Sequence, residues 1–324
     1  MLTRRRFTTA LLAASTAPAF GQGVDNLRRT VRGMKQLHAI IIQRGDEVVL
    51  AEAPRGRGLD RPANIKSCSK SVVALLLGTA IARKEIPSIR ASLRGVAPRL
   101  IPATATPGAG DITMEDLVTL RAGLGSTSGG NYGSWVQSRN WIAYALSRPM
   151  MDRPGGSMIY STGSTHILGA ALATASKKSL LALARERLGG PLKIEIPGWT
   201  ADPQGFYFGG NEMALSPRAM LKIALVMRDR GRFGEAQVIP EDWIAASIVP
   251  RTQSPYSGLD YGYGWFLSRS GFIIARGYGG QIIAAHPQRR LAVAITSDPA
   301  QPARSGGYFG DLMALLEGPI QSLA

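Results

Sequence analysis

The sequence predicts an α/β fold (strictly α+β), in which both ends of the chain form one antiparallel sheet flanked by helices and the middle forms an inserted all-α lobe. Three observations support this prediction. Strand-like runs lie near the N-terminus, helical patterns dominate from about residue 113 to 247, and strand-like runs return from about residue 259. We therefore expect the sheet to come from about residues 24–62 and 255–324, and the helical lobe from about 85–250.

Residues 1–19 have the pattern of a secretory signal peptide, removed from the mature chain of residues 20–324. Arg4, Arg5 and Arg6 make a basic segment, an apolar stretch too short for a membrane span follows, and Ala17-Pro18-Ala19 is a small-residue cleavage site. The arginines followed by Phe7 resemble the twin-arginine signal, which exports folded proteins; an ordinary Sec signal is the alternative. Both predict a periplasmic or extracellular protein without stable membrane insertion after cleavage.

The composition is that of an ordinary globular protein, with 45% hydrophobic and 19% charged residues. The net charge is +16, which falls to +13 when the three leader arginines are removed. The arginines are scattered, and neither a basic stripe interleaved with aromatics nor a helix-turn-helix or zinc signature occurs. The charge therefore indicates solubility and attraction to an anionic envelope, and no nucleic-acid partner is expected.

The N-terminal part is expected to begin with a hairpin. Residues 37–43 and 47–52 are β-rich runs on either side of Arg44-Gly45-Asp46, whose composition favours a turn. The run from 72 to 82 is apolar on nearly every side, which predicts a helix buried between layers. Thr113 with Asp116 three residues later resembles a capping box and predicts a helix start.

The remaining elements follow from caps, breakers and periodicity. Helices are expected at residues 140–147, 164–175, 216–230 and 241–247, with a last amphipathic helix at 309–323. Strands are expected at 263–267, 272–275, 281–285 and 291–296. The glycine- and serine-rich loop 123–133 carries Tyr132; it either lines a site or is an ordinary surface loop.

Ser67-Cys68-Ser69-Lys70 stands at the head of the buried helix and is the first candidate for chemistry. A serine hydroxyl needs a neighbouring base to take its proton. Residues three apart in a helix lie on one face, so Lys70 would place its amine near the Ser67 oxygen. The free N–H groups at the helix N-terminus would favour an oxyanion there. The plain alternative is a helix start with a solvated lysine.

Other catalytic and metal chemistries find no support in the sequence. His38, His166 and His286 are far apart and lack metal-ligand spacing, so no metal or other cofactor is expected. His166 is expected to be a satisfied, partly buried histidine. Neither a Gly-x-Ser-x-Gly elbow nor a Gly-x-x-x-x-Gly-Lys phosphate loop occurs. Cys68, the single cysteine, excludes an internal disulfide and is expected to be a small buried side chain.

Two later segments would complete the site, although singly each also fits a plain turn or bulge. Tyr160 precedes helix 164–175, so its phenol would point at Lys70. A nearby cation favours the phenolate form of a tyrosine. Lys70 and Tyr160 would then together take the Ser67 proton and return it to the leaving group. The segment Gly277-Tyr278-Gly279-Gly280-Gln281 opens an apolar strand, and its glycines would let a substrate approach the strand edge. The Gln281 N–H would then hold an oxyanion together with the Ser67 N–H.

In this order and spacing, the three segments resemble the serine hydrolases of the β-lactamase and penicillin-binding-protein superfamily, specifically the class C-like branch. That branch contains esterases, D-amino-acid peptidases and 6-aminohexanoate-dimer hydrolases. The family's Ser-x-x-Lys pattern matches Ser67 and Lys70, its Tyr-x-Asn motif matches Tyr160-Ser161-Thr162, and its Lys-Thr-Gly motif matches Tyr278-Gly279-Gly280. The resemblance extends over nearly the whole mature chain and implies the β-lactamase/transpeptidase-like fold.

Two departures from the family pattern concern the substrate. Thr162 stands where β-lactamases carry an asparagine that contacts the substrate amide. Tyr278 replaces the lysine that attracts the substrate carboxylate, and a phenol does not supply that charge. Both departures are more typical of the esterase and aminohexanoate-dimer hydrolase branch.

The resemblance therefore implies a serine hydrolase that cleaves a small ester or amide through an acyl-enzyme on Ser67, with Lys70 and Tyr160 as base and acid. Thr162, Tyr278, Gly280 and Gln281 are the expected substrate contacts. A β-lactamase or D,D-peptidase acting on cell-wall peptides, and a catalytically silent module that binds envelope peptides, are the alternatives. The sequence does not predict the oligomeric state.

Overall fold

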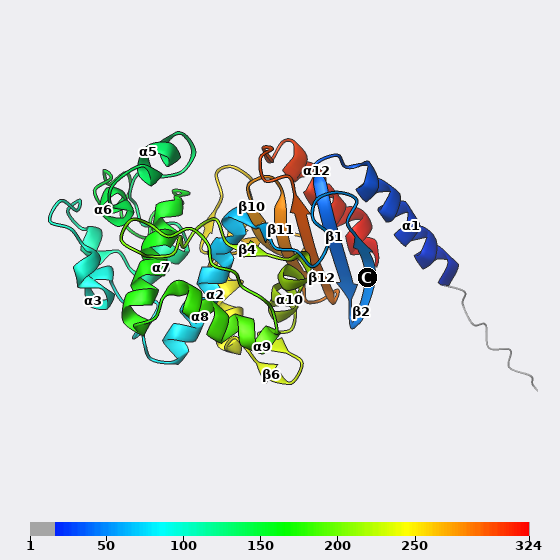
Figure 1. Ribbon diagram of the computed structural model, residues 1–324, viewed down its shortest axis with the longest axis horizontal. Coiled ribbons are helices and arrows are strands. Elements are labelled where there is room, and N and C mark those ends of the chain that lie inside the picture. The colour runs from blue at the N-terminus through cyan, green and yellow to red at the C-terminus, as the bar shows by residue number, and fades with distance from the viewer. Residues whose placement is uncertain (1–16, 324) are drawn as a thin grey trace, which may run out of the picture.

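The computed structural model describes residues 17–323 and is built around an eight-stranded antiparallel sheet with the order β2-β1-β12-β11-β10-β9-β8-β7 (Figure 1). β1 pairs with β12 on one side and β2 on the other, so that Ile42 lies opposite Val293 and Leu50. The two ends of the chain therefore form one sheet, and the predicted fold class is confirmed. The strands are β1 (Leu37–Arg44), β2 (Glu47–Glu52), β7 (Thr252–Gln253), β8 (Asp260–Tyr261), β9 (Phe266–Leu267), β10 (Ile273–Gly277), β11 (Gln281–His286) and β12 (Leu291–Ser297).

The N-terminal region differs from the prediction, because a helix precedes the first strand. The predicted signal peptide of residues 1–19 lies, up to residue 16, outside the described residues. Helix α1 (Ala17–Gly33) follows, so residues 24–33, which we expected in the sheet region, are helical. Val24, Leu27 and Val31 are buried in the core under the sheet, at the spacing of one helix face. Arg28 and Arg32, on another face, pair with Glu52 of β2.

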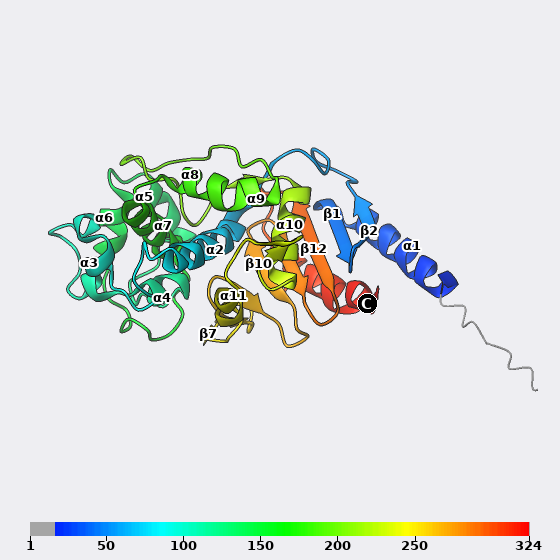
Figure 2. The same cartoon turned by 90° about the horizontal axis from the view of Figure 1, so that it is seen from below.

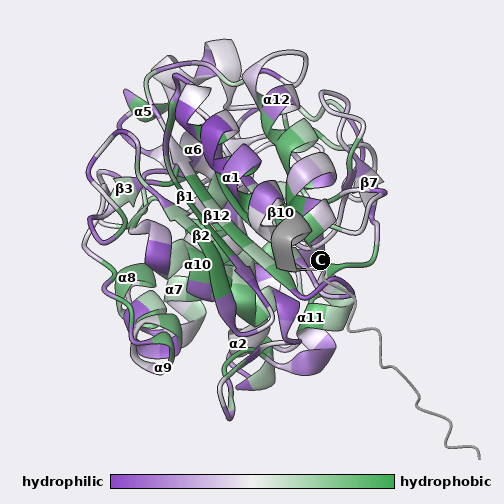
Figure 3. Ribbon diagram, turned by 90° about the vertical axis from the view of Figure 1, so that its right-hand side faces the viewer, coloured by the Kyte–Doolittle hydropathy of each residue, from purple (hydrophilic) through white to green (hydrophobic). Residues whose placement is uncertain are grey.

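The two faces of the sheet bury two different cores, because successive strand residues point in opposite directions. Ile40, Ile42 and Val293 lie in the core that α1 and α12 (Tyr308–Leu315) cover. Ile41 and Ile283 lie in the core of α2 (Ser69–Ala82) and α10 (Pro217–Arg228). In Figure 3 the green of hydrophobic residues runs along the central strands between these helices.

A helical lobe extends from one end of the sheet (Figures 1 and 2). The predicted capping box is confirmed: Thr113 and Asp116 bond reciprocally at the start of α4. Helix α11 (Glu241–Ser247) has the predicted bounds. The lobe contains α3 (Leu93–Val96), α4 (Met114–Val118), α5 (Tyr132–Val136), α6 (Trp141–Leu146), α7 (Thr162–Ser176), α8 (Leu180–Ala184) and α9 (Gly190–Leu192).

The predicted lobe boundary of residue 250 is too late, because α10 packs on β1, β11 and β12. An amphipathic pattern shows that a helix buries one face, but it does not identify the layer that covers this face. Two short strand pairs lie outside the main sheet, β3 (Ala63–Asn64) with β4 (Ala214–Leu215) and β5 (Arg232–Phe233) with β6 (Ala236–Gln237).

Helix α2 joins the two halves. It packs on α7 of the lobe and on β10 of the sheet. Its residues 69–80 are all buried, so the burial predicted for the apolar run 72–82 is confirmed except at its end, where Ile81 is half-buried and Ala82 is exposed. A 3-10 turn, η1 (Lys66–Cys68), leads directly into it.

Two predicted elements are shorter than expected. In the predicted strand 263–267 only Phe266 and Leu267 are β, because Gly264 has φ +79° and the chain turns there. The predicted helix 309–323 is α-helical only to Leu315; it continues as a π turn (Leu316–Ile320) that contains Pro319 and a 3-10 turn (Gln321–Leu323). Between residues 17 and 323, no single helix is long and apolar enough to cross a membrane, although the bent pair Thr162–Ser176 with Leu180–Leu192 meets that test jointly.

Candidate active site

Ser67 and Lys70 meet as the sequence spacing predicted. Ser67 lies in η1, and Lys70 lies in the first turn of α2. The Lys70 Nζ is 3.1 Å from the Ser67 Oγ. Lys66, just before the serine, has φ +50°, a conformation that costs energy for a residue with a side chain and is common at functional sites.

Lys70 is buried, with 3% of its surface exposed. Its Nζ is 2.7 Å from the Gly210 carbonyl oxygen and 3.3 Å from the Thr162 Oγ1. Burial lowers the pKa of Lys70 to about 7. The plain reading as a solvated lysine is therefore wrong. Near neutral pH much of Lys70 is a free amine, whose two hydrogens can point to Gly210 and Thr162 while its lone pair faces Ser67.

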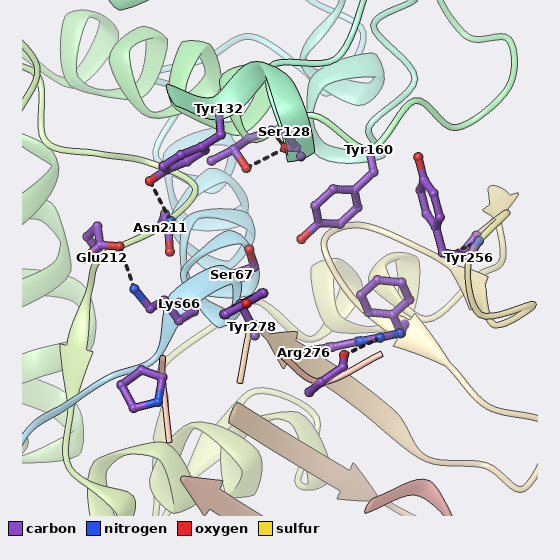
Figure 4. A pocket seen from close by; sticks show the side chains of 17 residues that line it. Lys66, Ser67, Ser128, Tyr132, Tyr160, Asn211, Glu212, Tyr256, Arg276 and Tyr278 are labelled. Carbon is purple, nitrogen blue, oxygen red and sulfur yellow. Dashed lines mark hydrogen bonds and ion pairs between the residues drawn. The ribbon is translucent and has the colours of Figure 1, made fainter. Parts of the chain in front are cut away.

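Tyr160 reaches the same point from the segment before α7, and its hydroxyl points toward Ser67 (Figure 4). The Lys70 Nζ lies 5.0 Å from the centre of its ring. Burial raises the pKa of Tyr160, although a hydrogen bond with Ser67 and the charge of Arg276 oppose the shift. The expected phenolate is thus not favoured; Tyr160 is a neutral phenol at neutral pH.

A pocket of about 530 Å³ opens above Ser67 (Figure 4). Tyr132 lines it, so the loop 123–133 contributes to the site, a point that the sequence left open. Ser128 of the same loop bonds Thr162, 2.9 Å between their hydroxyl oxygens. The lining residues are Lys66, Ser67, Ser128, Gly129, Tyr132, Tyr160, Thr162, Asn211, Glu212, Ser254, Tyr256, Phe266, Arg276, Gly277, Tyr278, Pro299 and Ala303.

The histidines take no part in this pocket. His166 and Asp202 form a buried pair outside its lining, with 3.0 Å between Nε2 and Oδ2, so His166 is a satisfied histidine, fully rather than partly buried. Among residues 17–323, no group of three or more His, Cys, Asp or Glu side chains could hold a metal ion. Cys68 is buried beneath the site as expected; its Sγ donates to the Gln281 carbonyl oxygen at 3.4 Å, and burial raises its pKa.

Comparison with known proteins identifies the family. The model of the family described as Beta-lactamase matches residues 27–316. The chain belongs to the beta-lactamase family. No curated protein matches it in sequence.

Solved structures share the fold of this beta-lactamase family member at low sequence identity. A protein assigned as a 6-aminohexanoate-dimer hydrolase from Bacillus anthracis is 16% identical, with a TM-score of 0.73 over 90% of this chain and 82% of its own. EstCE1, a hydrolase with promiscuous acyltransferase activity, is 14% identical, with a TM-score of 0.75 over 94% and 99% of the two chains. A penicillin-binding protein homologue from Caulobacter crescentus is 15% identical, with a TM-score of 0.75 over 94% and 97%.

The strand edge that contacts the nucleophile turn begins earlier than the segment Tyr278-Gly279-Gly280, which we matched to the third motif. Gly277, at the end of β10, is the glycine that touches the nucleophile turn: a Cβ on it would lie 2.4 Å from the Ile65 carbonyl oxygen. Cβ atoms on Gly279 and Gly280 would instead meet Asp298 and Tyr308. The strand edge beside Ser67 is therefore Arg276-Gly277-Tyr278.

Two of the predicted substrate contacts are consequently wrong. Gly280 and Gln281 are buried and do not line the pocket. The Gln281 side chain bonds the backbone of Ser297 on β12, at 2.8 Å from Nε2 and 3.0 Å from Oε1. Thr162 and Tyr278 do line the pocket. Three glycines within four positions made the register of this edge ambiguous in the sequence.

Arg276 lines the pocket, although nothing in the sequence pattern predicted it as a site residue. Its guanidinium stacks 3.5 Å from the centre of the Phe309 ring and donates to the Ser305 hydroxyl and the Ala303 carbonyl. Burial lowers the pKa of Arg276 to about 10, while Tyr160 opposes the shift. These partners carry no charge, so none of them neutralises the guanidinium. Arg276 thus places a cation in the lining of the pocket, a charge that Tyr278 does not supply.

Proposed function

We propose that this serine hydrolase forms an acyl-enzyme on Ser67 from a small ester or amide, with Lys70 as base and Tyr160 as acid. The contact between the buried Lys70 amine and the Ser67 hydroxyl carries the proposal. A buried lysine whose pKa is lowered to about 7 is an effective general base at neutral pH. A silent binding module has no use for such a pair, and we do not retain that alternative.

In acylation, the Lys70 lone pair takes the Ser67 proton while the Ser67 oxygen attacks the carbonyl carbon of the substrate. The carbonyl oxygen becomes an oxyanion, for which we propose the backbone N–H groups of Ser67 and Tyr278, two residues that line the pocket. When the intermediate collapses, the bond to the leaving group breaks. Tyr160 donates its proton to the leaving oxygen or nitrogen, and Lys70 returns the serine proton to the phenolate.

In deacylation, water takes the place of the leaving group. Lys70 accepts a proton as the water oxygen attacks the acyl carbon, and the proton returns to the Ser67 oxygen when the acyl bond breaks. Each group ends in its starting protonation state, so the cycle consumes only substrate and water.

Arg276 refines the proposed substrate. It interacts electrostatically with Tyr160, the proposed acid for the leaving group. In the close-up, Arg276 and Tyr256 lie on one side of Ser67, and Asn211 and Glu212 lie on the other (Figure 4). We therefore propose that the leaving group carries an anionic substituent. Arg276 also favours a second candidate, a D,D-peptidase or β-lactamase, because cell-wall peptides and β-lactams carry such a carboxylate.

A substrate panel tests the function. The parent, Ser67→Ala and, as control, the exposed Ser134→Ala are each incubated with a fluorophosphonate probe, p-nitrophenyl esters, anilides and a fluorescent penicillin. We expect labelling and ester or amide turnover in the parent and in Ser134→Ala only. Turnover in Ser67→Ala at the parent rate contradicts the proposal, and rapid penicillin turnover by the parent favours the second candidate.

We also propose export to the periplasm or beyond, on the basis of the predicted signal peptide alone. Replacing Arg4, Arg5 and Arg6 by lysines is expected to retain the protein in the cytoplasm if the twin-arginine route is used. An unchanged distribution on cell fractionation favours the Sec route, and a wholly cytoplasmic parent refutes export.

A further inference from the structure

The buried pair His166–Asp202 is connected to Lys70 through the backbone of Gly209 and Gly210. Both side chains are fully shielded from solvent, with 0% exposed. The rings of Trp135, Trp141 and Phe208 surround the imidazole, with centroids 5.9, 5.5 and 5.7 Å away. Neither residue lines the pocket. Any effect of the pair on the site is therefore transmitted through the backbone that it bonds, the Gly209 N–H.

The hydrogen bonds define the protonation of the pair. The Gly209 N–H donates to the His166 Nδ1 at 3.4 Å. A backbone N–H only donates, so Nδ1 carries no proton and Nε2–H donates to the Asp202 Oδ2. The other carboxylate oxygen, Oδ1, accepts from the Gln204 and Phe206 N–H groups, both at 2.9 Å. His166 is thus neutral and Asp202 ionised.

The next residue links this pair to catalysis. The Gly210 carbonyl accepts the shortest of the three Lys70 contacts, 2.7 Å, and Gly210 follows Gly209 directly. Both glycines pack tightly on the first turns of α7. A Cβ on Gly209 would lie 2.4 Å from the Thr165 oxygen, and one on Gly210 would lie 2.9 Å from the Thr162 oxygen. The carbonyl therefore has little freedom while His166 holds Gly209.

We propose that His166 and Asp202 are positioning residues for Lys70: they fix the Gly210 carbonyl, which takes one amine hydrogen and leaves the lone pair facing Ser67. The inference rests on the proposed role of Lys70 as base. Without a fixed carbonyl, the amine can rotate and donate to Ser67 instead of accepting its proton. The groups that titrate around Lys70 are Tyr160 and the Cys68 thiol.

Asp202→Asn is the sharpest test because it preserves shape. The two N–H donors of Gln204 and Phe206 retain the amide oxygen, so the new NH₂ faces His166 Nε2. Nε2 must then accept, the proton moves to Nδ1, and the bond from Gly209 is lost. His166→Gln removes the same acceptor by another route, since its amide reaches the Nε2 position but not the Nδ1 position. Trp141→Phe is the control, because it changes the packing on His166 and Phe208 but removes neither the Asp202 nor the Gly209 hydrogen bond of His166.

The readout is the rate at which a fluorophosphonate labels Ser67 as a function of pH, with thermal unfolding measured in parallel. Asp202→Asn and His166→Gln are expected to lower the maximal rate on the order of tenfold. They are also expected to move the acid limb to lower pH, because the Lys70 ammonium loses its acceptor. Trp141→Phe is expected to change neither value.

Parent-like rates and midpoints in both folded variants overturn the proposal, and so does a Trp141→Phe variant that reproduces their changes. The proposed function has its own readout. If Ser67→Ala is labelled like the parent, that function fails, whatever the His166 variants do.

Discussion

At the scale of the residue, Lys70 decides the pH dependence of the chemistry. Its pKa of about 7 means that a fall in pH through neutrality protonates the base and stops proton transfer. The raised pKa of Tyr160 keeps the phenol protonated well into the alkaline range. Both effects follow from burial rather than from an ion pair.

We predict that the rate of ester hydrolysis is half-maximal near pH 7 and reaches a plateau above it. Well below pH 7 the rate should fall about tenfold per pH unit. Lys70→Met is expected to remove both the activity and this limb. The exposed Lys178→Met is the control and should follow the parent curve. A Lys70→Met enzyme that retains the limb would show that another group is the base.

Arg276 leads to a second prediction at this scale. Arg276→Ala is expected to lower kcat/KM about tenfold or more for aryl acetates whose leaving phenol carries a carboxylate, because a charge-assisted hydrogen bond is lost. The same aryl acetates without the carboxylate are the control, because they measure any effect of the substitution that does not depend on the negative charge of the leaving group. An equal loss for both esters would mean that Arg276 supports the fold and does not select the substrate.

At the scale of the element, the contact of β10 with η1 brings the third part of the site to the nucleophile. Gly277 permits it, since its missing side chain is the space that the Ile65 carbonyl fills. The φ of Gly277 is not in the left-handed region, so a substitution there changes space alone.

Gly277→Ala is accordingly expected to lower the free energy of unfolding by about 1–3 kcal/mol, because the methyl group overpacks the contact. Activity should fall more than stability, since the strand edge moves away from Ser67. Gly306→Ala serves as control, because its Cβ would meet nothing within 4 Å. Full activity in Gly277→Ala would place the third motif elsewhere.

At the scale of the whole molecule, α2 makes one cooperative unit of lobe and sheet, because it packs on both. Leu76→Ala, at a fully buried position of α2, is expected to cost about 2–5 kcal/mol. Near-UV and far-UV circular dichroism should still report one coincident unfolding transition. Separate transitions would show that the lobe and the sheet unfold independently.

The parts that the sequence predicted correctly are local. The hairpin, α2, α11 and the Thr113 cap follow from periodicity and capping, and the Ser67–Lys70 contact follows from helical spacing. Tyr160 could be assigned only through the resemblance to the order of the family's motifs. The parts that were wrong or missing depend on contacts between residues far apart in the chain. Which glycine of the segment 277–280 lies beside Ser67, for example, depends on the contact of Gly277 with Ile65 and Lys66, about two hundred residues earlier.

Cys68 has a practical consequence for following this protein in solution. Its thiol is buried behind the nucleophile and bonded to β11, about two hundred residues later in the chain. A thiol reagent can reach it only when the floor of the pocket separates from the sheet. Since Cys68 is the single cysteine, the rate of its modification reports how often the contact between Cys68 and β11 opens. A ligand that fills the pocket should slow this reaction, and no engineered label is needed to follow it.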